Sequence, residues 1–191
     1  FHYLTSKGLN CQRKHHNIWV PSKHNTPGKP TVLLISHIDT VKPSGSWTYD
    51  AFTPTEVEDK LYGLGSNDAG ASLVSLIMTF IALEEMPPQK YNYILAISAE
   101  EEVAGIHGVA SIMGDIGKIV LAIVGEPTQM KMAIAEKGLM VLDCIARGKS
   151  GHSARNEGIN AIYKAIEDIE WFRKFHFPKE SDILGPVKMT I

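Results

Sequence analysis

Three short runs of consecutive apolar residues stand out along the chain, each bounded by proline or by polar residues: 31–35 (TVLLI), 93–97 (YILAI) and 119–124 (IVLAIV). An uninterrupted run of this length is typical of a strand buried on both faces of a parallel sheet. Residues 69–86, between the first two runs, are apolar at helical spacing, and a shorter helix is expected from about Val103 to Met113. This alternation predicts an α/β fold with a mixed, largely parallel sheet flanked by helices.

After the third run the pattern changes. Residues 138–147 alternate apolar and polar positions in the manner of a half-exposed antiparallel strand, and residues 187–191 begin another strand-like run. Residues 160–172, between them, have the spacing of an amphipathic helix. We therefore expect a domain boundary near Ala133, followed by a smaller α+β unit.

Composition and charge narrow the range of partners. Of the 191 residues, 44% are hydrophobic and 21% are charged, which is the balance of a soluble globular protein. The net charge of -2 gives no electrostatic footprint for nucleic acid or an anionic membrane, and the only basic cluster, residues 13–16, is short. The longest apolar stretch, residues 69–83, falls short of a bilayer span and is expected to be a buried helix. We expect a small-molecule partner, no nucleic acid, no membrane and a cytoplasmic location.

The cysteines and the ends of the chain add two expectations. Cys11 and Cys144 are far apart and form no CxxC pair, which favours a reducing compartment over a disulfide framework. Phe1 stands in place of an initiator methionine, in what resembles the end of a helix, and Ile191 lies inside a strand-like run. The chain is therefore expected to be a fragment.

Polar residues follow each of the three predicted strands. The first leads into residues 36–40 (SHIDT), the second into 98–102 (SAEEE) and the third into 125–128 (GEPT). In open α/β sheets ligands bind beyond the carboxyl ends of the strands, so these residues are expected to converge. A fourth segment, 65–70 (GSNDAG), places Asp68 at the start of the apolar helix, where an N-cap role alone would explain it.

The residue types at these strand ends suit a metal site. A divalent cation such as Zn²⁺ takes imidazole nitrogen and carboxylate oxygen, which His37, Asp68, Glu102 and Glu126 supply. A pair of ions needs a bridging carboxylate, for which Asp68 is the natural candidate. Asp39, two residues after His37 in an extended segment, points the same way and could orient the imidazole. Taken singly, His37 could be a packing or hydrogen-bonding histidine, and Glu126 could be a strand-end carboxylate held extended by Pro127.

The five ordered motifs SHIDT, GSNDAGAS, SAEEEVAG, VGEPT and GKSGHSA carry a family resemblance. Together they resemble the co-catalytic zinc amidohydrolases, which include acetylornithine deacetylases, succinyl-diaminopimelate desuccinylases, aminoacylases and glutamate carboxypeptidases. The resemblance extends from about Leu33 onward. It is strongest to the acetylornithine deacetylases, through the stretches IVGEPTQMKMAIAEKGLMVLD and RNEGINAIYKAI.

The resemblance implies a role for each residue of the predicted metal site. His37 and Glu126 match ligands of the first metal, Asp68 matches the bridging carboxylate, and Glu102 matches a ligand of the second metal. Glu101 matches the general acid/base. Two Zn²⁺ or Co²⁺ ions are implied as cofactors.

Further residues match supporting positions of the family. Asp39 corresponds to the aspartate two after the histidine, and Glu100 stands where the family often has Asp. His152 resembles a histidine of the lid domain that reaches the partner's active site and stabilises the developing oxyanion. Arg155 and Asn156 either anchor the carboxylate of an amino-acid substrate or lie at the surface, and both interpretations stay open.

The implied domain organisation has consequences for activity. Residues 1–133 correspond to the N-terminal part of a catalytic domain, and 134–191 to the start of a ferredoxin-like lid and dimerisation domain. The family's last metal ligand, a histidine, lies beyond Ile191, so the second site is incomplete here. We expect a homodimer formed through the lid, and we expect this chain alone to be inactive.

The implied reaction is hydrolysis of the amide of an N-acyl amino acid. N-acetyl-ornithine is the favoured substrate, with N-acetyl-citrulline and N-succinyl-ornithine as close relatives, in arginine biosynthesis. A dipeptidase or exopeptidase is the nearest alternative. A two-metal phosphoesterase is a candidate from another class, but the strand ends carry no Lys or Arg to bind phosphate. A non-catalytic relative used for binding or dimerisation is a third possibility.

Overall fold

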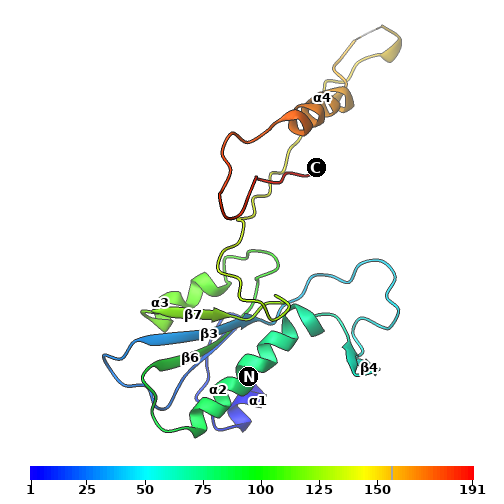
Figure 1. The fold of residues 1–191 in the computed structure, drawn as a ribbon. Coiled ribbons are helices and arrows are strands. Elements are labelled where there is room, and N and C mark those ends of the chain that lie inside the picture. Colours follow the sequence, from blue (N-terminus) through cyan, green and yellow to red (C-terminus); the bar gives the residue numbers. More distant parts are fainter. Residues whose placement is uncertain (156) are drawn as a thin grey trace. The chain divides into compact units, whose positions relative to one another are not determined.

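The computed structural model describes residues 1–155 and 157–191 and divides into two compact units, Phe1–Met130 and Lys131–Ile191 (Figure 1). The division lies close in the chain to the boundary expected near Ala133. That the two parts are a catalytic domain and a lid domain stays a prediction.

The first unit contains a five-stranded sheet with the strand order β1-β2-β6-β3-β7. Strand β3 lies between β6 and β7 and is parallel to both, whereas β2 is antiparallel to β6 and to β1. The predicted α/β class with a mixed sheet and flanking helices is confirmed. The strands are β1 (Gln12–Lys14), β2 (Asn17–Pro21), β3 (Thr31–His37), β6 (Asn92–Ser98) and β7 (Leu121–Val124).

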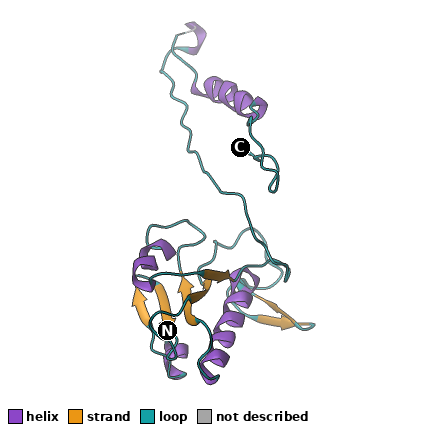
Figure 2. Cartoon of the chain, turned by 60° about the vertical axis from the view of Figure 1, so that its left-hand side comes forward, coloured by secondary structure: helices purple, strands orange, loops and turns teal. Residues whose placement is uncertain are grey.

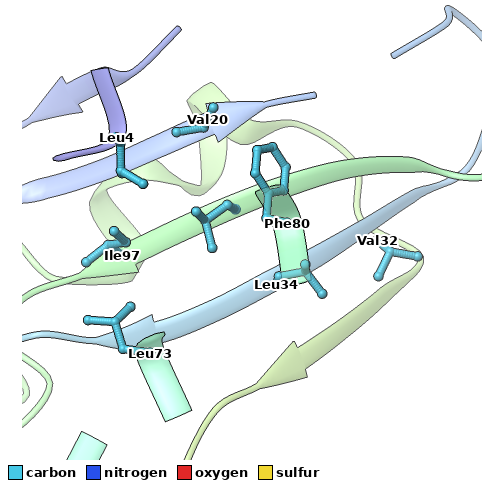
Figure 3. Close-up of a cluster of buried hydrophobic side chains, with 8 residues drawn as sticks. Leu4, Val20, Val32, Leu34, Leu73, Phe80 and Ile97 are labelled. Atoms are coloured by element: carbon cyan, nitrogen blue, oxygen red, sulfur yellow. The ribbon is translucent and has the colours of Figure 1, made fainter. Parts of the chain in front are cut away.

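The central strands β3 and β6 contain the apolar runs 32–35 and 93–97, and both of their faces are covered. The burial expected for the third run is wrong, because β7 is the last strand of this sheet and all four of its residues are exposed. On one face, α1 (His2–Ser6) and α2 (Ser72–Glu85) pack on the sheet (Figures 1 and 2). Figure 3 shows this cluster of buried side chains: Leu4, Val20, Val32, Leu34, Leu73, Phe80, Leu95 and Ile97. On the other face the core consists of Trp19, Leu33, Ile35, Ile94, Ala96, Ile112 and Ile116. Successive residues of β3 alternate between the two clusters, as the pleat of a strand requires.

The predicted helix over residues 69–86 begins later and is less buried than expected. A π-helical turn, η1 (Ser66–Ala71), precedes α2, and α2 buries only one face through Leu73, Phe80 and Glu84. In length and mean hydropathy (1.3) the stretch Ser66–Glu85 resembles a membrane span. It nevertheless includes the irregular turn and packs along the sheet through Leu73 and Phe80. The absence of a membrane partner stays a prediction.

The predicted helix from Val103 to Met113 is wrong over most of its length. Turns occupy residues 101–104, and the helical residues are η2 (Val109–Ile112), a 3₁₀ turn, and α3 (Met113–Ile116). Glu100 has a φ of 62°, and its backbone carbonyl accepts the N–H of Gly105 at 2.9 Å. Its carboxylate accepts the N–H of His107 at 3.1 Å, so donors that a helix would need are used within this loop.

Two hairpins in the first unit were not predicted from the sequence. Strands β1 and β2 form one, and β4 (Thr55–Val57) pairs antiparallel with β5 (Lys60–Tyr62) in a separate two-stranded sheet (Figure 2). The strands of the second hairpin are three residues each and mostly exposed, so they lack the apolar runs that reveal β3 and β6.

The second unit contains one of the predicted elements. Helix α4 (Ala161–Lys174) confirms the amphipathic helix, and Asn160 caps it by accepting the N–H of Ile162 at 2.9 Å. The strands expected at residues 138–147 and 187–191 are wrong. Within the described residues of this unit, strand-type pairing is limited to the isolated bridges Lys149–Ile159 and Ser181–Gly185. An alternating pattern of apolar and polar residues gives a strand one apolar face, but it does not provide the neighbouring strand that its backbone hydrogen bonds need.

Candidate metal centre

His37 is the last residue of β3 and is only 2% exposed. The sheet holds it in place: His37 pairs with Ser98 of β6, and the N–H of Ile38 donates to the Ser98 carbonyl at 3.0 Å. Its Nε2 lies 3.1 Å from Asp68 Oδ1 and 3.7 Å from Glu126 Oε2. A single buried imidazole nitrogen is thus faced by two carboxylates from distant parts of the chain.

Asp68 reaches this position because the chain bends before α2. Gly65 adopts a φ of 75°, and its carbonyl accepts the N–H of Gly70 at 2.9 Å, which closes the turn around Asp68. The N-cap positions of η1 and α2 are Gly65 and Ala71, and neither makes a side-chain capping bond. The alternative that Asp68 is only a helix cap is therefore wrong, since its carboxylate faces His37 instead.

Glu126 is placed by the tight approach of Gly125 to β3. The N–H of Gly125 donates to the Ile35 carbonyl at 2.7 Å, and its carbonyl accepts the Ser36 hydroxyl at 2.8 Å. A Cβ at position 125 would lie 2.9 Å from Leu76 Cδ1 and 3.0 Å from Ser72 Cβ. The absence of a side chain lets residue 125 pass close to β3 and α2 without displacing Leu76 or Ser72, and the next residue emerges beside His37.

The glutamate triplet follows the end of β6 at Ser98. The backbone N–H of Glu102 donates to Asp39 Oδ2 at 3.1 Å, which ties this loop to the end of β3. Ligand atoms of His37, Asp68 and Glu102 all lie within 4.8 Å of one another. Glu101 is exposed, and its charge acts on the His37 ring.

Asp39 supports the ring of His37 from the opposite side. Nδ1 of His37 lies 3.0 Å from the backbone carbonyl of Asp39 and 3.6 Å from its Oδ1. If Nδ1 carries the proton and donates it to that carbonyl, Nε2 keeps a free lone pair toward Asp68 and Glu126. This is the tautomer that a metal ligand requires.

The surroundings of His37 raise the pKa of its ring. Burial is the largest single effect and lowers the pKa, because it disfavours the charged imidazolium. The hydrogen bond to the Asp39 carbonyl, the charge of Glu126, the hydrogen bond to Asp68 and the charge of Glu101 together outweigh it. The cluster thus favours a positive charge at this point.

The donor set fits a divalent cation. One imidazole nitrogen and carboxylate oxygens are the ligands that Zn²⁺ takes in catalytic sites, and a cation would neutralise carboxylates that are crowded around a single ring. Buried Asp39 Oδ1 makes no hydrogen bond within the described residues and lies on the far side of the ring, where a supporting carboxylate is expected. The roles of His37, Asp68, Glu102 and Glu126 as ligands, and the number of ions, stay predictions.

The remaining predicted site residues belong to the second unit. His152 is exposed and accepts the N–H of Ala154 on Nδ1 at 3.2 Å, and the N–H of Arg155 donates to the His152 carbonyl at 3.0 Å. Asn156 lies outside the described residues. The structure does not place these residues relative to the first unit, so their roles stay predictions.

Two residues of this region were missed by sequence reasoning. Gly125 lies in the motif VGEPT, but the motif alone gives no steric reason for it, and no motif contains Asn17. Asn17 is 0% exposed, and the signal that could have drawn attention to it is a polar residue directly before an apolar strand, residues 18–20.

Comparison with known proteins identifies the chain's relatives. Residues 33–182 match the model of peptidase family M20/M25/M40. A peptidase M20 domain-containing protein of Schizosaccharomyces pombe is 32% identical over 203 residues, covering 99% of this chain and 47% of that protein. An acetylornithine deacetylase of Pectobacterium carotovorum is 38% identical over 181 residues, covering 84% of this chain and 45% of that protein. The chain spans about half the length of the curated relatives it matches.

Among solved structures, a tripeptidase from Staphylococcus aureus is similar in fold. It aligns with a TM-score of 0.55 at 17% sequence identity, covering 88% of this chain and 48% of that one. At this level of identity the likeness concerns the fold alone.

Proposed function

Because the chain belongs to peptidase family M20/M25/M40, we propose that the full-length protein is a metal-dependent hydrolase that cleaves the amide bond of an N-acyl amino acid. One observation carries the proposal. Around the buried His37, oxygen atoms of Asp68 and Glu126 lie 3.1 and 3.7 Å from Nε2, and Glu102 is close enough to share an ion with His37 and Asp68.

For the substrate we propose N-acetyl-ornithine, with N-acetyl-citrulline and N-succinyl-ornithine as close alternatives, in arginine biosynthesis in the cytoplasm. The likeness to an acetylornithine deacetylase supports this choice. Peptide hydrolysis is the second candidate, since the family that the chain belongs to is described as a peptidase family.

In the proposed site, His37, Asp68, Glu102 and Glu126 would hold Zn²⁺ or Co²⁺, and the full-length protein would hold two ions. A bound cation of this kind makes water a nucleophile near neutral pH and polarises the acyl carbonyl. Asp39 holds the His37 ring in the tautomer that leaves Nε2 free to bind, and it anchors the loop that carries Glu102.

Glu101 performs the proton transfers of the proposed reaction. It accepts a proton from the attacking water as the new C–O bond forms, and it delivers that proton to the amine nitrogen as the C–N bond breaks. Its exposure leaves it accessible to water, and the effect of its charge on the pKa of His37 supports a place close to the proposed site.

We further propose a homodimer formed through residues 134–191, in which His152 acts in the partner's site and stabilises the oxyanion. Because His152 Nδ1 accepts the Ala154 N–H, the neutral ring carries its proton on Nε2 and can donate it. Arg155 would then be available to bind the substrate carboxylate.

Mixing inactive variants of the full-length protein tests the action of His152 in trans. Dimers of Glu101→Gln and dimers of His152→Asn are each expected to be inactive. A mixed dimer should regain activity, because one of its sites combines an intact Glu101 with an intact His152 from the neighbour. Mixed dimers as inactive as the parents would contradict the proposal.

The test of the main proposal is a deacylation screen of the full-length protein with metal analysis of the same sample. The substrates are acetyl-ornithine, succinyl-ornithine, acetyl-citrulline, a dipeptide and a phosphodiester. We expect hydrolysis of an acyl amino acid that stops on chelation and returns with Zn²⁺ or Co²⁺. Hydrolysis of the dipeptide alone would favour the second candidate, and turnover of the phosphodiester alone would refute both.

A further inference from the structure

The loop between β6 and η2, residues 99–108, carries both Glu101 and Glu102. Its own hydrogen bonds fold it into turns: Gly105 N–H donates to the Glu100 carbonyl at 2.9 Å, and Ala104 N–H donates to the Glu101 carbonyl at 3.0 Å. These local bonds shape the loop but do not fix its position on the sheet.

Asn17, the first residue of β2, connects this loop to the sheet through hydrogen bonds of its side chain. Its Oδ1 accepts the backbone N–H of Ala99 at 3.0 Å, where the loop begins. Its Nδ2 donates to the His107 carbonyl at 2.6 Å and lies 3.4 Å from the Gly108 carbonyl, where the loop ends. One side chain therefore joins the two ends of the loop.

Because Asn17 is buried, losing one of these hydrogen bonds would be costly in free energy. The side chain is 0% exposed, so its amide has no access to water as an alternative partner. Ser111 Oγ and the Lys14 carbonyl, at 3.3 and 3.4 Å, complete the surroundings of Nδ2. A buried amide satisfied on both its donor and its acceptor side defines one orientation, and losing either side leaves a polar group unpaired.

Neighbours of Asn17 on the β1–β2 turn support the same loop. The His15 ring stacks on His107, with 4.1 Å between centroids and 30° between planes. Lys14 Nζ lies 2.8 Å from Asp115 Oδ2 of α3, which follows the loop. The hydrogen bonds of Asn17 are therefore buried, whereas the His15–His107 stack and the Lys14–Asp115 ion pair beside them are exposed.

We propose that Asn17 is a positioning residue, which holds the 99–108 loop so that Glu101 and Glu102 lie in place at the metal site. It acts through the backbone at Ala99, His107 and Gly108 and touches no reacting atom. This inference rests on the proposed function for its catalytic consequence. Its structural content, control of the loop by the first residue of β2, is independent of the reaction.

Asn92 offers a matched control. It is also an asparagine at the start of a strand, is 9% exposed, and is bonded on both sides of its amide. Its partners are the N–H and carbonyl of Thr26 and the carbonyl of Lys29, so it fixes the loop at the opposite end of the sheet. A purely structural effect of losing a buried amide should be similar for both residues.

The experiment compares Asn17→Asp with Asn92→Asp in the full-length protein. Both changes keep the size and an acceptor oxygen but replace the N–H donors by a carboxylate. For Asn17→Asp we expect faster hydrogen exchange across residues 99–108, weaker Zn²⁺ binding, a kcat lower by about tenfold to a hundredfold and little change in KM. For Asn92→Asp we expect a comparable loss of resistance to urea, with kcat and exchange at residues 99–108 unchanged.

Two results would overturn the inference: equal losses of kcat in the two variants, or exchange at residues 99–108 that Asn17→Asp does not alter. Asn17→Ser removes the amide without burying a carboxylate and decides the matter if Asn17→Asp does not fold. It should change exchange and kcat in the same direction, and no change would count against the inference. If the unaltered protein cleaves no acyl amino acid, the proposed function fails, whereas exchange and Zn²⁺ binding still decide the role of Asn17.

Discussion

Asp39 and His37 lie two residues apart at the end of β3, and the backbone carbonyl of Asp39 is 3.0 Å from His37 Nδ1. The carboxylate of Asp39 accepts the N–H of Glu102 at 3.1 Å with one oxygen and lies 3.6 Å from the imidazole with the other. One aspartate therefore supports two predicted ligands from different strand ends.

This arrangement predicts the effect of Asp39→Asn in the full-length protein. The amide can still accept the Glu102 N–H, but the negative charge beside the imidazole is lost. We expect Zn²⁺ affinity to fall about tenfold to a hundredfold, measured by calorimetry, because supporting partners orient a ligand and raise its basicity. Asp50→Asn is the control, since Asp50 accepts the N–H of Phe52 in an exposed loop. If the Asp39→Asn variant binds Zn²⁺ with unaltered affinity, Asp39 does not support the metal site.

Replacing Glu101 by Gln separates proton transfer from metal binding. We expect kcat to fall by about 10²- to 10⁴-fold, because an amide cannot accept and return the proton of the attacking water. Zn²⁺ content, measured by mass spectrometry on the same sample, should stay nearly unchanged. Loss of metal from the variant would indicate that Glu101 is a ligand. The roles predicted for Glu101 and Glu102 would then be interchanged.

The raised pKa of His37 predicts a pH dependence of metal binding. The imidazolium cannot bind a cation, so Zn²⁺ affinity should fall as the pH is lowered through the raised pKa of His37. Calorimetric titrations over a series of pH values measure this, with His176→Gln as a control at an exposed position. An affinity independent of pH would argue against ligation by His37.

In the metal-free protein, lowering the pH should have the opposite effect on stability: it should stabilise the fold through His37. A pKa raised in the folded state means that protonation of His37 favours folding. This contribution should be fully present below the ordinary histidine pKa of about 6.5 and lost as the pH rises through the raised value. Urea unfolding of the metal-free protein tests it, and His37→Gln should remove this part of the pH dependence.

Gly125→Ala tests the close packing that places Glu126. A methyl group there meets Leu76, Ser72 and Ser36, and we expect a loss of about 1–3 kcal/mol in the free energy of unfolding. Gly114→Ala is the control, because a Cβ in α3 has no neighbour within 4 Å. Urea unfolding distinguishes them, and equal stabilities would mean that the packing at Gly125 relaxes freely.

Phe80→Ala tests the core beneath the site. Phe80 is 0% exposed and lies among the side chains of the sheet, so its truncation should cost about 3–5 kcal/mol of unfolding free energy (Figure 3). Phe52 is 76% exposed, and Phe52→Ala should change stability by less than about 0.5 kcal/mol. A similar response of the two variants to urea would contradict the packing described for α2.

The sequence alone predicted the centre of the fold, for a physical reason. Strands β3 and β6 are buried on both faces, so they appear as continuous apolar runs, and the rule that ligands gather at carboxyl ends then points to His37 and the glutamate triplet. The rule works because β3 is parallel to both β6 and β7, which brings three strand ends to one edge.

The parts that could not be predicted depend on contacts distant in sequence. Residues 103–108 lie in a loop that begins with the turn at Glu100 and is bonded to Asn17. Neither feature produces a periodic pattern of apolar residues in the sequence. Residues 138–147 alternate as a strand does, but without a pairing partner in the described part of the unit the pattern gives no strand. The steric need for Gly125 is likewise visible only once α2 lies against β3.

The position of β3 between β6 and β7 also fixes when the metal site can form during synthesis. Val32 pairs with Tyr93 on one side and with Leu121 on the other, although both partners are made long after it. His37 itself pairs with Ser98 of β6, and Glu126, which lies 3.7 Å from His37 Nε2, follows β7 in the chain. The predicted ligands His37, Asp68, Glu102 and Glu126 can therefore come together only after β7 has been made and has joined the sheet, so an ion that meets a shorter growing chain would find only part of the predicted set.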